Sequence, residues 1–398
     1  MVSLGSYYSI SELANAAENE FHARYSRSPE FIVAAPGRVN LIGEHVDYND
    51  GLCLPMAIER YVVIAAAPND GSDGPFAEFY SSNLQEAVIV SLQATHRSGS
   101  NGWCRYLEGI VRGFMARGVA IPSFDAIIYS NVPLGGGLSS SAALEVATAT
   151  VLELLTQTDL EPVEKALLCQ AAEQEIVGVP CGIMDQFSSV FGKPDELMLL
   201  DCRAQKIQAI PFPIEEITIL IVNSNVAHEL SSGEYAKRRA QCQSVLEKLQ
   251  QSSWRDVTMD CLGSCSEMLS ATEYRRARHV VTEIARTVEA AKAAESGKWE
   301  RVGELMYASH ESLRDDFNVS CDELDILVEL AREAGVEGGV LGSRMTGGGF
   351  GGCTVSIVES EKAEKLIESL VFKYEQITGI KPDGFTSRPA QGAHVIKE

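Results

Sequence analysis

Apolar residues along the chain fall into two patterns, short continuous runs and longer segments with helical spacing. Runs rich in β-branched and aromatic residues predict strands at 31–35, 61–67, 86–92, 124–129, 197–201, 217–223 and 353–358. Apolar positions three or four residues apart predict helices at 11–28, 103–115, 144–155 and 163–177, with several more between 236 and 336. Strands and helices are therefore expected along the whole chain, which contains neither an internal repeat nor a low-complexity tail.

The length of the chain favours two domains. A chain of 398 residues is longer than one ordinary hydrophobic core supports. Pro211 and Pro213 interrupt the pattern between two predicted strands, which puts a boundary within 205–215. We therefore expect a first domain over residues 1–208 and a second over residues 209–398.

The composition is that of a globular protein, with 45% hydrophobic and 22% charged residues. The longest apolar run, Tyr61 to Ala67, is far shorter than a membrane span. The segment from Met1 to Glu20 has no basic stretch followed by an apolar core, so we expect no secretory signal. Ten cysteines without an export signal then predict free thiols in a reducing, cytoplasmic compartment.

The formal net charge of −22 bears on the partners of the protein. A field of this sign repels nucleic acids and anionic membranes, so neither is an expected partner. It also repels any phosphorylated ligand. Such a ligand must then be attracted locally, by backbone N–H groups, a few basic side chains and a metal ion.

One segment, Pro133 to Ala143, combines three glycines with three serines between a predicted strand and a predicted helix. Glycines let the backbone approach a ligand closely, and a helix start presents unpaired N–H groups at the positive end of its dipole. This order of elements favours a phosphate site that holds the triphosphate of a nucleotide. The alternative is a flexible glycine-serine turn that serves only to cap the helix.

A second segment, Pro36 to Tyr48, follows the predicted strand at 31–35 and is read as a loop. Four different polar residues, Arg38, Glu44, His45 and Asp47, occur here within ten positions. Loops that follow strands often carry functional groups, so this density favours a ligand loop. The alternative is a solvated turn.

An isolated acid, Asp185, lies in a largely apolar stretch that contains Gly178 and Gly182. A carboxylate among apolar neighbours is costly unless it is paired or used. The alternative is that Asp185 caps a helix. Basic residues further along the chain are interpreted as solvated helix faces; these are Lys237, Arg238, Arg239, Arg275, Arg276 and Arg278.

A third glycine cluster, Gly342 to Cys353, contains a G-x-G-x-x-G match. A strand is predicted after it, whereas a dinucleotide-binding fingerprint requires a helix there. The companion motifs of protein kinases are absent from the sequence, as is a G-x-x-x-x-G-K-[ST] phosphate loop. Two possibilities remain, a glycine hairpin that packs tightly or one that approaches a ligand closely.

Together, Pro36 to Tyr48, Pro133 to Ala143 and Thr346 to Cys353 resemble the three motifs of the GHMP small-molecule kinases. Residues 181–187, 201–203 and 223–235 are similar to the galactose-specific branch of that family, and the resemblance covers about residues 30 to 395. It implies an α+β fold of two domains. A mixed-sheet N-terminal domain is followed by an α+β C-terminal domain, with the active site in the cleft between them.

The resemblance also implies a reaction and a set of residues. The reaction is the ATP-dependent phosphorylation of the C1 hydroxyl of α-D-galactose to galactose 1-phosphate, the first committed step of galactose catabolism, with ATP and Mg²⁺ as cofactors. Asp185 matches the catalytic aspartate and Arg38 its partner. Positions that match sugar-binding residues are Arg38, Glu44, His45, Asp47, Gly182, Asp185 and Tyr235. Positions that match the nucleotide site are Ser82, Asn83, Trp103, Gly135, Gly136, Gly137, Leu138, Ser139, Ser140 and Ser141, with Ser141 and Glu173 at the magnesium site.

Two other functions remain open at this point. A related kinase acting on N-acetylgalactosamine or arabinose would differ in the pocket around the sugar 2-position, which the sequence does not reveal. A galactose sensor without catalysis would be expected to carry an altered serine loop, whereas Ser139 to Ala142 is unbroken here. Ala227 departs from the family pattern, where a basic residue is expected, so one contact with the nucleotide or its loop is expected to be missing. The expected partners are the sugar and ATP, and the oligomeric state stays open between a monomer and a weak dimer.

Overall fold

The computed structural model describes residues 9–72, 74–93, 102–227 and 231–398. The strands are β1 (Phe31–Asn40), β2 (Leu52–Cys53), β3 (Pro55–Pro68), β4 (Phe76–Ser81), β5 (Glu86–Ser91), β6 (Phe124–Ser130), β7 (Glu196–Asp201), β8 (Lys206–Pro211), β9 (Ile217–Ala227), β10 (Val340–Met345), β11 (Gly351–Glu359), β12 (Asp383–Ser387) and β13 (His394–Lys397). The helices are α1 (Ile10–Tyr25), α2 (Cys104–Ala116), α3 (Ser140–Thr156), α4 (Pro162–Ala172), α5 (Met184–Phe191), α6 (Ser231–Lys248), α7 (Met259–Ser264), α8 (Ala271–Glu295), α9 (Trp299–Ser312), α10 (Asp322–Ala334) and α11 (Ala363–Thr378).

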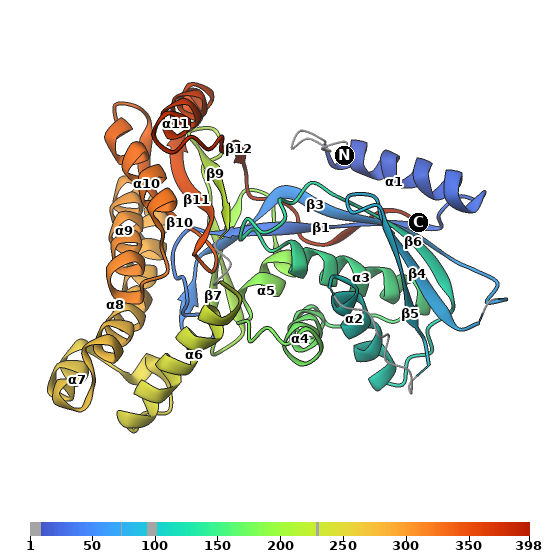
Figure 1. Ribbon diagram of the computed structural model, residues 1–398, viewed down its shortest axis with the longest axis horizontal. Helices are drawn as coiled ribbons and strands as arrows, with labels where there is room; N and C mark the ends of the chain where they lie inside the picture. Colours follow the sequence, from blue (N-terminus) through green and yellow to red (C-terminus); the bar gives the residue numbers. More distant parts are fainter. Residues whose placement is uncertain (1–8, 73, 94–101, 228–230) are drawn as a thin grey trace.

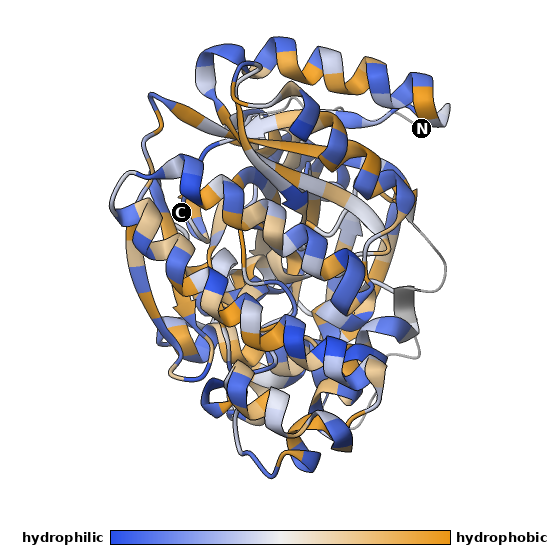
Figure 2. Cartoon of the chain, turned by 90° about the vertical axis from the view of Figure 1, so that its left-hand side faces the viewer, coloured by the Kyte–Doolittle hydropathy of each residue, from blue (hydrophilic) through white to orange (hydrophobic). Residues whose placement is uncertain are grey.

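A six-stranded sheet in the order β13-β1-β3-β6-β4-β5 forms one half of the molecule. Its neighbouring strands are antiparallel except β4 and β6, which makes it a mixed sheet. Helix α1 covers one face, and α2, α3, α4 and α5 lie on the other (Figure 1). The apolar residues of α1 recur at helical spacing, as the hydropathy colouring in Figure 2 shows, and Leu13, Ala17 and Phe21 are buried against the sheet.

A four-stranded sheet in the order β10-β11-β9-β12 forms the other half, with α8, α9 and α10 beside it (Figure 1). Helix α9 lies directly on β10 because two glycines let the backbones touch. A Cβ atom on Gly303 would lie 1.9 Å from the carbonyl oxygen of Leu341, and one on Gly342 would lie 2.2 Å from the Cα atom of Gly303. A small third sheet has the order β2-β7-β8.

The end of the chain returns to the first sheet, where β13 pairs with β1. The α+β fold with two sheets agrees with the expected architecture. The division into 1–208 and 209–398 stays a prediction, and the position of β13 means that the last four strand residues belong to the sheet formed by the beginning of the chain. Of the described helices, none has the length and apolar character needed to cross a membrane.

Three differences from the sequence predictions bear on the domain boundary and on two candidate site residues. The strand predicted at 31–35 continues to Asn40, so that Arg38 lies on a strand instead of a loop. Strand β8 occupies part of the segment in which the prolines suggested a boundary. The helix predicted at 163–177 changes at Glu173 into a π-helical turn, Glu173–Val177.

The interpretation of the basic residues as solvated faces is wrong for Arg238 and Arg276, which are 4% and 5% exposed. Arg238 donates to the carbonyl oxygens of Phe317 (2.9 Å) and Asn318 (2.8 Å), and Arg276 donates to that of Asp316. These carbonyls end the π-helical turn Leu313–Phe317, where backbone acceptors lack partners within the helix. The guanidinium groups satisfy them, and this draws both side chains inward.

Candidate active site

The glycine-serine loop, residues 131–139, connects β6 to α3. Gly135, Gly137 and Ser139 have φ values of 72°, 71° and 60°. The left-handed conformation costs glycine little but is unusual for serine, so the loop is held in shape by its surroundings. The Ser139 hydroxyl makes no capping bond and instead donates to Asp185 Oδ2 at 2.5 Å. The N–H groups of the first turn of α3 are left for a ligand.

The glycine hairpin between β10 and β11 packs against this loop. A Cβ atom on Gly347 would lie 2.8 Å from the Gly137 carbonyl oxygen, and one on Gly352 would lie 2.9 Å from that of Gly136. Gly347, Gly348 and Gly349 also border a cavity. The hairpin therefore packs tightly, as one of the two possibilities requires, and it also borders a cavity.

Arg38 and Asp185 form an ion pair at the centre of the site. Arg38 is 4% exposed on β1 and directs Nη2 and Nε to Asp185 Oδ1, at 2.6 and 2.8 Å. Its Nη1 donates to the Gly137 carbonyl oxygen at 2.6 Å. Asp185 lies in the first turn of α5, and its two carboxylate oxygens accept from Arg38 and Ser139. The carboxylate is thus fixed by Arg38 and Ser139 at the border of the cavity.

The acidic loop, residues 41–50, follows β1. Glu44 Oε1 accepts hydrogen bonds from Thr346 Oγ1 (3.1 Å) and from the Gly347 amide (2.8 Å). His45 Nδ1 lies 2.9 Å from the Tyr48 hydroxyl. Tyr235 from α6 packs with its ring centroid 5.5 Å from that of His45, so this wall is built from both halves of the chain.

Asp47 and Gly182 fit together at the same cavity. A Cβ atom on Gly182 would lie 1.9 Å from Asp47 Oδ2, so only glycine leaves room for this carboxylate. Burial, together with the nearby carboxylates of Asp185 and Glu44, raises the pKa of Asp47 to about 7. Burial lowers the pKa of His45 to about 3, which keeps its imidazole neutral.

Ser141 and Glu173 lie together where α3 begins, with Ser141 Oγ 3.4 Å from Glu173 Oε1. Gln186 donates to Glu173 Oε2 at 2.7 Å and to Glu145 Oε2 at 3.1 Å, which orients the carboxylate. In the described part of the chain no group of three or more His, Cys, Asp or Glu residues could hold a metal ion. A carboxylate and a hydroxyl fit Mg²⁺, which keeps several waters and takes its other ligands from substrate phosphates.

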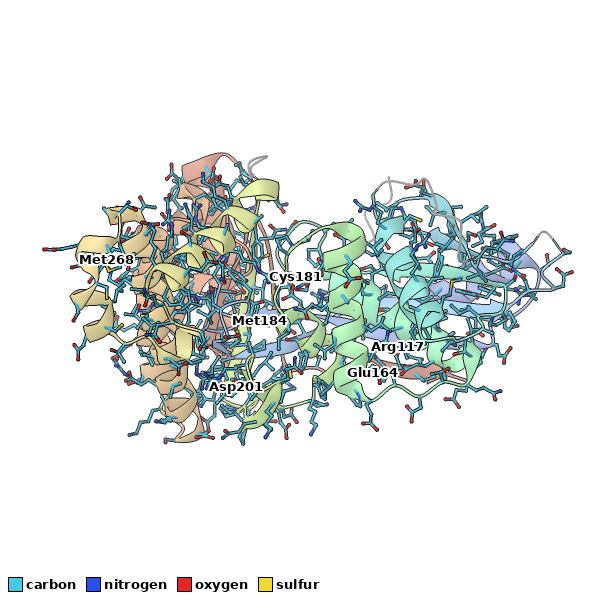
Figure 3. The ribbon with its side chains drawn as sticks, turned by 90° about the horizontal axis from the view of Figure 1, so that it is seen from below. Arg117, Glu164, Cys181, Met184, Asp201 and Met268 are labelled. Carbon is cyan, nitrogen blue, oxygen red and sulfur yellow. The ribbon has the colours of Figure 1, made fainter. Side chains whose placement is uncertain are left out.

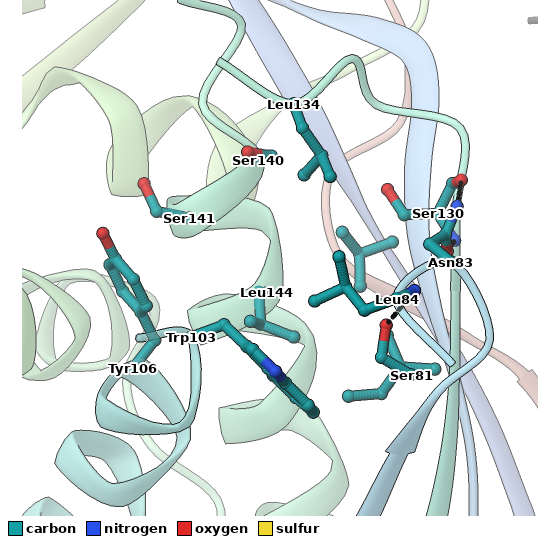
Figure 4. Close-up of a pocket in the computed structure, with 12 residues that line it drawn as sticks. Ser81, Asn83, Leu84, Trp103, Tyr106, Ser130, Leu134, Ser140, Ser141 and Leu144 are labelled. Atoms are coloured by element: carbon teal, nitrogen blue, oxygen red, sulfur yellow. Dashed lines mark hydrogen bonds between the residues drawn. The ribbon is translucent and has the colours of Figure 1, made fainter. Parts of the chain in front are cut away.

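Two cavities meet at the start of α3. The first is largely apolar, and Trp103 and Tyr106 face Ser81, Asn83 and Leu84 across it (Figure 4). The second is polar and is bordered by Arg38, Glu44, His45, Asp47, Gly135, Gly137, Ser139, Glu173, Gly182, Asp185 and Tyr235. Ser140 and Ser141 border both. Cys181 and Met184, on the loop and helix start beside the polar cavity, lie near the middle of the molecule in Figure 3.

Three expected nucleotide residues do not border either cavity. The Ser82 hydroxyl donates to Glu20 Oε2 at 2.6 Å, and it is the neighbouring Ser81 that borders the apolar cavity. Gly136 packs against Cys353, and Leu138 is buried in the core. Asn83 and Trp103 do border the apolar cavity, where the Trp103 indole N–H donates to Glu86 at 3.0 Å. The side chain of Ala227 lies outside the described part.

Sequence reasoning missed Arg344, which is fully buried on β10. Its Nη2 lies 3.3 Å from Glu44 Oε1, and its Nη1 donates to the Asn40 carbonyl oxygen at 2.7 Å. The residue lies within the third glycine cluster, but a local pattern does not reveal a partner 300 positions away. Sequence reasoning also missed three residues that border the apolar cavity, because they look like ordinary helix and loop positions. These are Tyr106, Leu134 and Leu144.

Comparisons with known proteins show the family and the fold of this chain. A model of the galactokinase galactose-binding signature matches residues 19–68, and the N- and C-terminal domain models of the GHMP kinases match residues 105–193 and 290–376. The galactokinases of Homo sapiens and Canis lupus familiaris are 42% and 43% identical, over 97% of this chain and of each relative. The crystal structure of Lactococcus lactis galactokinase complexed with galactose has a TM-score of 0.90 at 31% identity and covers 96% of this chain and 99% of its own. The mevalonate kinase of Methanococcus jannaschii shares the fold, with a TM-score of 0.64 at 19% identity over 92% of this chain and all of its own.

Proposed function

The chain belongs to the galactokinase family of the GHMP kinases, and we propose that its two adjoining cavities are the nucleotide and sugar halves of one active site. The reaction is the ATP-dependent phosphorylation of the C1 hydroxyl of α-D-galactose. The observation that carries the proposal is that Ser140 and Ser141 border both cavities. A triphosphate that starts in the apolar cavity reaches the polar one across the N-terminus of α3, where N–H groups and the helix dipole favour anions.

Asp185 and Arg38 carry the proton and charge chemistry in this proposal. Asp185 accepts the proton of the sugar C1 hydroxyl as the oxygen attacks the γ-phosphorus of ATP, and the bond from that phosphorus to the β–γ bridging oxygen breaks to release ADP. Arg38 keeps the carboxylate aimed through the 2.6 Å ion pair and stabilises the negative charge that develops on the oxygen. Its bond to the Gly137 carbonyl ties this pair to the loop that holds the phosphates. The protein therefore accelerates the reaction mainly by aligning the sugar C1 hydroxyl with the γ-phosphorus of ATP.

Ser141 and Glu173 are the residues that would hold Mg²⁺, which when bound neutralises charge on the phosphates of ATP. This local positive charge offsets the repulsion of the phosphates that is expected from a net charge of −22. Leu134, Leu144 and Trp103 provide the apolar surface for the adenine base. The protein is proposed to act in the cytoplasm on galactose and MgATP, without a nucleic-acid or membrane partner.

A coupled assay of ADP release with galactose and MgATP tests the function directly. We expect release that depends on both substrates and that stops when the divalent cation is chelated. Galactose should be a better substrate than N-acetylgalactosamine or arabinose, because the comparisons favour the galactose-specific branch. Binding of galactose and ATP without ADP release from any sugar would instead indicate a sensor.

Galactose binding is expected to weaken as the pH falls below 7. Asp47 borders the polar cavity, and its raised pKa of about 7 means that it is increasingly protonated below that pH. A sugar hydroxyl donates best to the ionised carboxylate, so binding must release a proton in this range. The dissociation constant should be nearly constant above pH 8 and rise by up to about tenfold per pH unit below 7. Calorimetry from pH 5.5 to 8.5 measures it, and Asp47→Asn should bind weakly with a flat profile. Parallel profiles for both proteins would assign the dependence to another group.

A further inference from the structure

A carboxylate outside both cavities, Glu283 on α8, contacts the acidic loop from behind. The Glu283 side chain is fully buried. Its Oε1 accepts hydrogen bonds from the backbone N–H groups of Gly43 (2.9 Å) and Glu44 (3.3 Å) and from the Ser309 hydroxyl (2.6 Å). Its Oε2 accepts from Arg286 Nε at 2.8 Å. The Glu283 carboxylate therefore binds two consecutive loop amides, and its own position is fixed by bonds from Arg286 on α8 and Ser309 on α9.

His279, one turn earlier on α8, holds the same loop through a carbonyl. Its Nε2 lies 3.1 Å from the Glu44 carbonyl oxygen, and its Nδ1 lies 2.9 Å from Ser312 Oγ. A carbonyl can only accept, so the proton is on Nε2 and the serine hydroxyl donates to Nδ1. Burial lowers the pKa of His279 to about 4, so the ring is neutral and keeps this arrangement at ordinary pH.

These contacts leave one polar atom of Glu44 for a ligand. Its N–H and C=O are bonded to Glu283 and His279, and its Oε1 accepts from the glycine hairpin. Oε2 has no hydrogen-bond partner among the described residues, and Glu44 borders the polar cavity. The backbone on either side of Glu44 is left-handed, since Gly43 and His45 have φ values of 97° and 60°. The loop therefore depends on outside bonds for the direction in which Glu44 points.

We propose that Glu283, assisted by His279, is a positioning residue that aims Glu44 at the sugar. This inference rests on the proposed sugar site and extends it to a helix that touches neither cavity. A carboxylate suits the task because hydrogen bonds to an ionised acceptor are stronger than those to a neutral one. An uncharged group in its place would hold the two amides more weakly, so that Glu44 is aimed less firmly while the nucleotide cavity stays unchanged.

The test is Glu283→Gln, with galactose and ATP affinities measured separately. We expect the galactose dissociation constant and KM to rise about tenfold, a factor that corresponds to one charge-assisted hydrogen bond, with kcat and the KM for ATP within about twofold. His279→Leu should raise the galactose KM in the same selective way, and it serves as the test if Glu283→Gln does not fold. Equal changes in both KM values, or no change in either, would overturn the proposal.

A matched control is Glu153→Gln on α3. Glu153 is also ion-paired, with Lys165, and also accepts from a backbone amide, that of Leu160 at 3.0 Å. This variant should lower the melting temperature but leave the galactose KM unchanged. Glu44→Gln tests the sugar site itself, so an unchanged galactose affinity in that variant would contradict the site and not the role of Glu283. In the double variant Glu44→Gln/Glu283→Gln, the fold increase in the galactose KM should be smaller than the product of the fold increases in the two single variants. An increase equal to that product would show that Glu283 does not act through Glu44.

Discussion

Asp185→Asn is expected to lower kcat by a factor of about 10²–10⁴ while galactose still binds. Asparagine keeps the volume of the side chain, and its carbonyl oxygen can still accept from Arg38, while its amide N–H can donate to Ser139 Oγ. It cannot take the proton of the C1 hydroxyl. The loss should therefore fall on turnover and leave the galactose dissociation constant within a few-fold. Steady-state ADP release and calorimetry with galactose measure the two quantities on the same preparation.

The control for this variant is Asp195→Asn, an exposed aspartate just beyond the end of α5. Its φ of 62° is a conformation that asparagine adopts readily, so this substitution should leave both the fold and kcat unchanged. If Asp185→Asn retained a kcat within about threefold of the unsubstituted protein, Asp185 would not be the base. Proton transfer would then have to follow the attack on phosphorus without help from a carboxylate.

Arg38→Met is expected to have the second largest effect, a loss of about 10²–10³ in kcat. The substitution retains much of the buried aliphatic length but removes the charge and three hydrogen-bond donors. Asp185 then loses the partner at 2.6 Å that aims it, and the Gly137 carbonyl oxygen loses its donor. Galactose affinity should fall less than kcat, because the walls formed by the acidic loop and Tyr235 remain. Steady-state kinetics measures the loss of kcat, and calorimetry measures the loss of galactose affinity.

Arg38→Lys and Arg27→Met complete this experiment. Lysine keeps the positive charge but cannot reproduce the forked geometry, so it should recover only part of the activity. Arg27, in the bend between α1 and β1, forms a similar pair with Asp125 of β6, also at 2.6 Å but away from both cavities. Arg27→Met should cost stability and leave kcat unchanged. An Arg38→Met protein that lost galactose binding in proportion to kcat would indicate a role in holding the sugar and not in the chemical step.

The local elements of the site could be predicted because each depends on neighbours in the sequence. The β6 strand, the glycine-serine loop and α3 follow one another within about thirty residues, and their residue types fix both the turn and the helix start. The glycine hairpin was also predictable, since the strand that follows it excludes a dinucleotide fingerprint. The grouping of Arg38 with Asp185, 147 positions apart, was expected only from the family resemblance.

The surroundings of individual side chains could not be predicted from the sequence. Arg238 and Arg276 have the spacing of an exposed basic face, yet the carbonyls at the end of a π-helical turn draw them inward. The sequence does not distinguish Ser82 from Ser81. In the structure the Ser82 side chain points toward Glu20, whereas Ser81 borders the apolar cavity. Such outcomes depend on which groups a distant segment presents, and a local pattern does not contain that information.

The sequence by itself determined the mixture of strands and helices, the order of strand, glycine-serine loop and helix and, through three ordered motifs, the family. Only the tertiary structure decided that two cavities share Ser140 and Ser141, and that Arg344 and Glu283 hold Glu44. The physical reason is the range of the interactions. Turns and helix starts are fixed by bonds between residues a few positions apart, whereas the aim of Glu44 is fixed by partners 235 to 303 positions away that meet it only in the assembled fold.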